Sequence, residues 1–99
     1  MKLNQIQLGA FLSKIYLLTE SGYSLLDSID LIRKNTHSPE FLPISRIGFD
    51  LQEGYSYDLA IEMNSEPLDE VIRHALHNLN TDSQFCRLLP AIITSLKAA

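Results

Sequence analysis

Apolar residues recur every three or four positions over nearly the whole chain, and this spacing constrains the fold more than any other feature of the sequence. Residues three and four apart lie on the same face of an α-helix, so each periodic stretch predicts a helix with one buried side. No stretch alternates between apolar and polar residues as a half-buried strand does. The sequence therefore predicts an all-α fold, a compact antiparallel bundle of about six short helices.

The boundaries of the first four helices are marked by glycine and serine. Gly22 and Gly54 suit helix C-terminal caps, and each is followed two residues later by a serine, Ser24 or Ser56, which suits the cap of the next helix. Asp27, three residues after Ser24, completes a capping-box pattern. The two glycine–tyrosine–serine segments indicate either an internal repeat or the ordinary chemistry of helical hairpins, and both interpretations stay open.

The last two helices are marked by proline and by a second capping box. Ser65 and Pro67 predict the start of the fifth helix, because proline is tolerated in a first turn. Thr81 and Gln84 predict the start of the sixth, which Pro90 should kink or divide. The predicted buried stripe of the fifth helix is Leu68, Val71, Ile72, Ala75, Leu76 and Leu79.

Size and charge restrict the classes of protein to which the chain can belong. Its 99 residues predict one domain, 1–99, and the net charge is −4. Basic residues are scattered from Lys2 to Lys97, so we expect no nucleic-acid partner. No apolar run approaches the roughly 20 residues that span a bilayer, and the start of the chain lacks a signal-peptide pattern. We therefore expect a soluble, non-secreted chain.

Catalytic machinery is not visible in the sequence, and we expect neither an enzyme nor a cofactor. Glu70, His74 and His77 have the spacing of helical metal ligands, but the same pattern is typical of a solvated helix face, which we favour. Cys86 adjoins buried-face residues, which indicates an inert thiol. No glycine-rich loop that could hold a phosphate occurs.

Tyrosines are the candidates for partner binding. Tyr23, Tyr55 and Tyr57 cluster in the two glycine–serine segments. Tyrosine is enriched at protein interfaces, because its side chain is both apolar and able to hydrogen-bond. The alternative interpretation is that these side chains cover the edges of the core.

Four residues in a fixed order resemble the sequence pattern of a known family. Phe11 lies in the first predicted helix, Gly22 and Gly54 end the first and third, and Pro67 leads the fifth. Together with the apolar spacing around them, from about residue 11 to about residue 96, they resemble the repeated cytoplasmic domain of the type II secretion F family. That family includes the PilC-like platform proteins of type IV pili.

Two departures from the family pattern are visible. Ser24 stands where the family usually has a proline after the first glycine. A Gly-Glu-x-Ser-Gly motif is replaced by Ala75, Leu76 and His77, and with it the acidic residue that some members use to bind calcium. The resemblance therefore implies no calcium site in this chain.

The resemblance implies a domain at the cytoplasmic face of the bacterial inner membrane that binds the assembly ATPase and other platform proteins. In that role it would couple ATP-driven motion to pilin assembly. We expect the native gene to continue beyond Ala99 into hydrophobic segments absent from this chain. Pairing into a homodimer is left open. The alternatives are a freestanding helical regulatory or adaptor domain and a metal-dependent enzyme that uses Glu70, His74 and His77.

Overall fold

The computed structural model describes residues 1–98, and six helices account for the regular structure of that part of the chain. The prediction of an all-α bundle is confirmed. The six helices are α1 (Gln5–Glu20), α2 (Leu25–Lys34), α3 (Phe41–Gln52), α4 (Tyr57–Glu62), α5 (Glu70–His77) and α6 (Asp82–Ala98).

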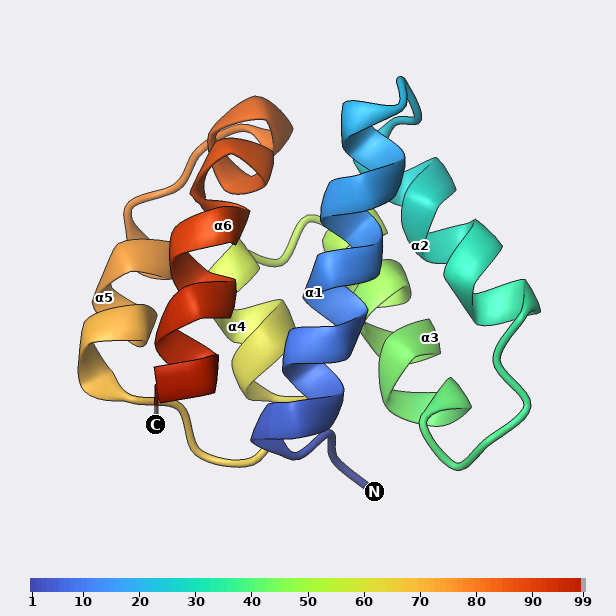
Figure 1. Ribbon diagram of the computed structural model, residues 1–99, viewed down its shortest axis with the longest axis horizontal. Coiled ribbons are helices and arrows are strands. Elements are labelled where there is room, and N and C mark those ends of the chain that lie inside the picture. Colours follow the sequence, from blue (N-terminus) through green and yellow to red (C-terminus); the bar gives the residue numbers. More distant parts are fainter. Residues whose placement is uncertain (99) are drawn as a thin grey trace.

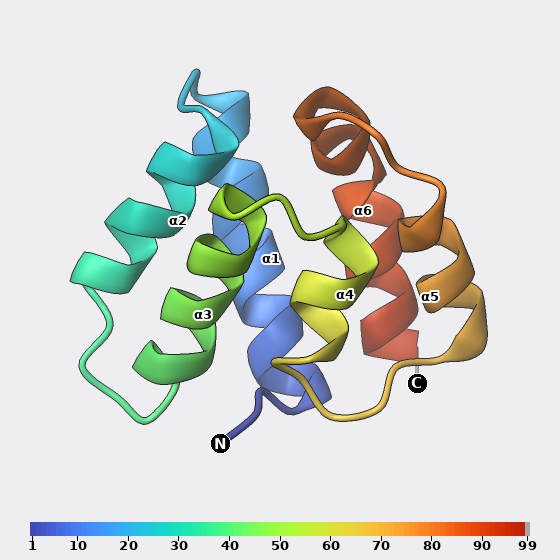
Figure 2. The same ribbon diagram turned by 180° about the vertical axis from the view of Figure 1, so that it is seen from behind.

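The helices form a closed ring in which direction alternates from one helix to the next (Figure 1). Each helix packs against its successor in the chain, and α6 returns to pack along α1, the most extensive contact between any two helices. Seen from behind, α3 and α4 close the other side of the ring (Figure 2). The body that results measures 31 × 27 × 25 Å.

The core is filled from every helix of the ring. The largest fully buried side chains include Phe85 of α6, Leu12 of α1 and Ile47 of α3. Val71 is an exception to the predicted stripe of α5, because 77% of its surface is exposed. It lies at the edge of a helix whose buried positions are Ile72 and Leu76, so the prediction that Val71 is buried is wrong.

An extended N-terminal segment ties the ring together at one end. Leu3 is 1% exposed and forms an isolated parallel bridge with Ser65 in the α4–α5 connection. Its N–H donates to the carbonyl of Asn64 at 3.0 Å, and its carbonyl accepts from the N–H of Glu66 at 2.8 Å.

This bridge holds the predicted start of α5 in a non-helical conformation. Residues 65 and 66 are engaged with Leu3, and Pro67 lies in the connection. Helix α5 begins only at Glu70, where the Asp69 carboxylate accepts a hydrogen bond from the N–H of Val71 at 2.8 Å. The prediction that α5 starts at Ser65 and Pro67 is wrong for this reason.

Both glycine caps are confirmed. Gly22 and Gly54 have φ angles of 104° and 94°, in the left-handed region that side chains rarely adopt. Ser24 Oγ accepts from the N–H of Asp27 at 3.1 Å, as predicted. Ser56 takes the predicted position before α4, but its hydroxyl makes no capping hydrogen bond there.

Helix α6 begins with the predicted capping box. Thr81 Oγ1 accepts from the N–H of Gln84 at 3.1 Å, and Gln84 Oε1 accepts from the N–H of Thr81 at 3.3 Å. Pro90 lies inside the helix without dividing it. The first turns of α6 are inclined to the rest in Figure 1, consistent with the predicted kink.

Close contact between α2 and α3 depends on the absence of a side chain at Gly48. A Cβ built there would lie 2.9 Å from Ile29 Cγ2, well inside van der Waals contact. The absence of a side chain at Gly48 therefore lets the surface of α3 lie directly against Ile29 of α2.

We predict that Gly48→Ala lowers the free energy of unfolding by about 1–3 kcal/mol, because the added methyl group forces α2 and α3 apart. Urea denaturation at low protein concentration measures the change. Gly9→Ala is the matched control: a Cβ there meets only Leu96 Cδ1 at 4.0 Å, so stability should stay constant or rise by up to about 1 kcal/mol. Equal losses for the two variants would contradict the packing described here.

Candidate functional site

The two glycine turns lie at the same end of the bundle. Helices α1 and α3 run in the same direction, so the turns that follow them lie toward the same end of the bundle (Figure 2). Their hydrogen bonding is also the same. The N–H of Tyr23 donates to the carbonyl of Leu18 at 3.1 Å, and the N–H of Tyr55 donates to that of Asp50 at 3.0 Å. The two tyrosines therefore hold equivalent positions after their helices.

A cleft of about 350 Å³ opens between the Gly54 turn, the start of α2 and the α5–α6 connection. We call it the tyrosine cleft. It is lined by Leu26, Leu51, Gly54, Tyr55, Ser56, Tyr57, Leu79, Asn80 and Asp82.

The three tyrosines predicted to bind a partner differ in their exposure. Tyr23 and Tyr55 are 49% and 50% exposed and can contact another molecule. Tyr57 is half-buried: its ring stacks on Phe85, with the ring centroids 5.0 Å apart and the planes 13° from parallel. The structure thus brings Tyr55 and Tyr57 to one cleft and makes Tyr57 a wall of it.

The hydroxyl of Tyr57 is held by the acidic residue at the start of α6. It donates a hydrogen bond to Asp82 Oδ1. Burial raises the pKa of Tyr57, and the neighbouring Asp82 carboxylate raises it further, so the phenol stays protonated. The hydrogen bond fixes the ring against Phe85 and gives the cleft a rigid side.

Acidic side chains outnumber basic ones at this end of the bundle, where Arg87 Nη2 lies 3.4 Å from Ser83 Oγ. Residues 20–27, 50–58 and 78–84 meet there and contain no lysine or arginine. The acidic residues of these three segments are Glu20, Asp27, Asp50, Glu53, Asp58 and Asp82. We call this surface, together with Tyr23 and the tyrosine cleft, the acidic end. It can attract a basic partner.

Two of the three candidate metal ligands of α5 contact other side chains, each a different one. Glu70 lies 4.0 Å from Arg73, and His77 Nδ1 lies 3.0 Å from Asp58 Oδ2. His74 is exposed to solvent. Over residues 1–98, no group of three His, Cys, Asp or Glu side chains has the geometry to hold a metal ion. The structure therefore does not bring Glu70, His74 and His77 together as a site.

Cys86 is half-buried beside α1. Burial raises the pKa of its thiol, an effect that the Thr19 hydroxyl opposes and the carboxylates of Asp82 and Glu20 reinforce. The net shift is upward, so the thiol stays protonated at neutral pH, in keeping with the inert role expected from the sequence.

Comparison with known proteins gives no relative: no protein-family model, curated protein or solved structure matches this chain. The family assignment therefore remains a prediction from the resemblance. Of the four residues that carry it, Phe11 is buried, Gly22 and Gly54 form the two turns, and Pro67 lies in the α4–α5 connection. Within residues 1–98, no helix is both long enough and apolar enough to cross a membrane.

The contact of Asp58 in α4 with His77 in α5 gives a testable pH dependence. The Asp58 side chain is 14% exposed. Burial alone would raise the pKa of Asp58, but Ser56, His77 and the N–H of Leu59 favour the carboxylate, so the pKa lies below its ordinary value of 3.8. The stabilisation is complete above that value and is lost as pH falls through the folded-state pKa.

We predict that Asp58→Asn lowers the free energy of unfolding at pH 7 by about 1 kcal/mol, because a hydrogen-bonded carboxylate is lost. The variant should also lose less stability than the parent on acidification below pH 4 or so. Asp30→Asn is the control: Asp30 pairs with Arg33 at 2.6 Å and Lys34 at 3.1 Å on an open surface, so its loss at pH 7 should be smaller. Denaturation across pH measures both effects; equal losses would contradict the stronger role given to Asp58.

Proposed function

We propose that this chain is a protein-binding domain of a platform protein for type IV pilus biogenesis or type II secretion, at the cytoplasmic face of the bacterial inner membrane. Its partners are the assembly ATPase and other platform proteins. The order of Phe11, Gly22, Gly54 and Pro67 supports the family, and the all-helical fold is compatible with it. The observation that carries the proposal is the acidic end, where two exposed tyrosines stand among mainly acidic side chains.

The chemistry of the acidic end favours a basic protein surface as its partner. Long-range attraction between opposite charges raises the rate of encounter, and it weakens as salt is added. Tyr23 and Tyr55 then supply apolar contact area and a hydroxyl each, the combination that often dominates binding energy at interfaces. The charges raise the association rate, and the tyrosine contacts lower the dissociation rate.

The stiffness of the bundle suits a part that transmits movement. Tyr57 is fixed by Phe85 and Asp82, so a load applied at the tyrosine cleft reaches α4 and α6 directly. Helix α6 in turn packs along α1. In this role the domain performs no reaction itself and passes the motion of the ATPase to the rest of the platform.

We predict that the double variant Tyr23→Ala/Tyr55→Ala binds the purified pilus or secretion ATPase of the same organism about 10- to 100-fold more weakly than the parent. Calorimetric titration measures the dissociation constants. Leu42→Ala is the matched control, since Leu42 is 62% exposed in the first turn of α3, at the opposite end of that helix from the acidic end.

The proposed interface also predicts a salt effect: binding by the parent should weaken markedly between about 50 and 500 mM salt. The double variant should lose affinity while keeping this salt dependence, because all six acidic side chains remain. Absence of binding to the ATPase, or an equal loss for Leu42→Ala, would contradict the proposal.

A further inference from the structure

The tyrosine cleft combines apolar walls with one charged group. Three leucines and the rings of Tyr55 and Tyr57 form the walls, and among the lining residues that the structure describes, Asp82 alone is charged. The volume of about 350 Å³ lies near the lower limit of the roughly 300–1,000 Å³ typical of small-molecule sites, so the cleft suits a single amino-acid side chain. The side chain that fits has an apolar body and a positively charged end.

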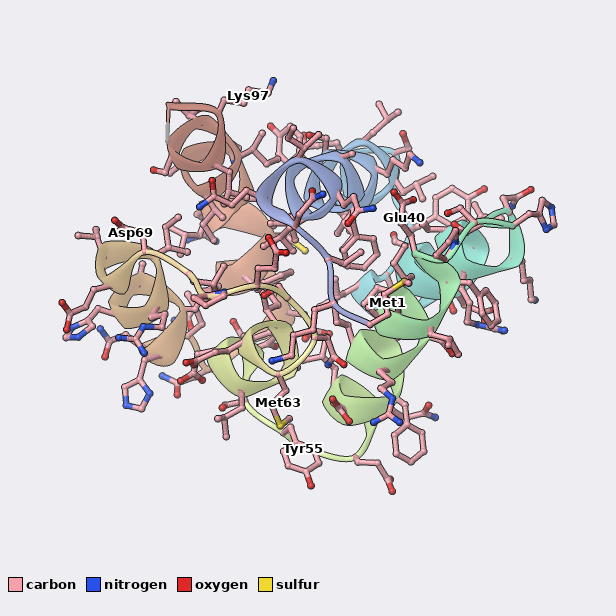
Figure 3. All side chains as sticks on the ribbon, turned by 90° about the horizontal axis from the view of Figure 1, so that it is seen from below. Met1, Glu40, Tyr55, Met63, Asp69 and Lys97 are labelled. Atoms are coloured by element: carbon pink, nitrogen blue, oxygen red, sulfur yellow. The ribbon has the colours of Figure 1, made fainter. Side chains whose placement is uncertain are left out.

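The two aromatic rings are placed to receive such a group. Tyr55 is 50% exposed and lies at the outer edge of the bundle, beside the connection from α3 to α4 (Figure 3). Tyr57 is already stacked on Phe85, and its hydroxyl donates to Asp82 Oδ1. The second oxygen of that carboxylate, Oδ2, is not engaged by the tyrosine and is open to a donor from a ligand. Because ring and carboxylate are fixed beforehand, a ligand does not bear the cost of ordering them.

Helix N-termini beside the cleft oppose a cation, but first-turn carboxylates more than offset them. The starts of α2, α4 and α6 all border the cleft. Each of these helices has an acidic residue in its first turn, Asp27, Asp58 and Asp82 respectively. A helix N-terminus is equivalent to about half a positive charge, whereas each carboxylate carries a full negative charge. The sum beside the cleft is therefore negative.

Basic side chains near these helix starts do not reach the cleft. His77 Nδ1 lies 3.0 Å from Asp58 Oδ2, and Arg87 Nη2 lies 3.4 Å from Ser83 Oγ. Neither basic residue is among those that line the cleft. The segment that forms its opposite wall, residues 50–58, carries further acidic residues and no lysine or arginine. The charge of the cleft thus favours a cation over an anion.

We propose that the tyrosine cleft binds the side chain of one arginine on the surface of the partner. The methylene groups of that arginine contact the leucines, and its guanidinium stacks on the tyrosine rings. The fork of N–H donors pairs with Asp82 and with the side-chain carbonyl of Asn80, both of which line the cleft. The inference rests on the proposed function, because it names the residue with which a basic partner enters the acidic end.

The same features select arginine over lysine. A guanidinium is planar and weakly hydrated, so it lies against an aromatic ring at little cost in lost water contacts. A lysine ammonium has the same charge but is compact and strongly hydrated, and it has no plane to stack. The walls of Tyr55 and Tyr57 therefore reward the shape of the cation as well as its charge.

The first test is an NMR titration of the isotope-labelled chain with three short capped peptides, in which a central arginine, lysine or citrulline is flanked by glycine. Citrulline has nearly the shape of arginine but no charge. The arginine peptide should bind with a dissociation constant of about 1 mM and shift the amides of Tyr55, Leu79 and Asp82. The lysine peptide should bind about threefold more weakly and the citrulline peptide at least about tenfold more weakly. Equal binding of the citrulline peptide, or no saturable shift up to about 20 mM, would overturn the proposal.

The second test removes the charge of the cleft. Asp82→Asn should weaken binding of the arginine peptide about tenfold, because the amide is uncharged, although its oxygen can still accept from Tyr57. Glu53→Gln is the matched control: it removes the same charge from an exposed position of the acidic end that does not line the cleft, so binding should change less than about twofold. Circular dichroism confirms that both variants are folded. Equal losses would overturn the pocket.

Peptide and ATPase titrations separate the pocket from the proposed function. Binding of the arginine peptide by a chain that does not bind the ATPase would support the pocket and contradict the proposed function. An ATPase that binds the parent and Asp82→Asn equally well would overturn the arginine pocket and leave the proposed function in place.

Discussion

The packing of α1 between α2 and α6 is the contact on which the rest of the structure depends. Helix α1 is the first element of the chain and receives the last, so it closes the ring. It places Leu8, Phe11, Leu12 and Ile15 in the core, and full burial of such side chains contributes about 1.5–3 kcal/mol each. Without α1, the apolar faces of α2 and α6 would be open to water. Leu3 extends this role by fixing the α4–α5 connection.

Local signals in the sequence predicted much of the fold. The six helices, the two glycine turns and the capping box at Thr81 depend on residues within one or two turns of each other, and all are confirmed. The prediction for the start of α5 was wrong, because that start depends on Leu3, some 60 residues away. Periodicity also identifies which residues share a helix face but not how much of that face neighbouring helices cover. Val71 is an example.

The candidate site was only partly predictable for the same reason. Tyr23 and Tyr55 could be named from their turns, and both are exposed. The stacking of Tyr57 on Phe85 joins residues 28 positions apart in the sequence, and no local pattern reveals it. The acidic end likewise forms only when three separate segments meet.

Native-state hydrogen exchange tests the closed ring most directly, because it measures the free energy with which each helix opens. If α1 and α6 hold the fold together, their central amides should be the slowest in the chain to exchange, and they should share one opening free energy equal to that of global unfolding. Exchange of α6 at a much lower free energy, while α1, α2 and α3 stay protected, would show that the ring opens at α6 and would contradict this account.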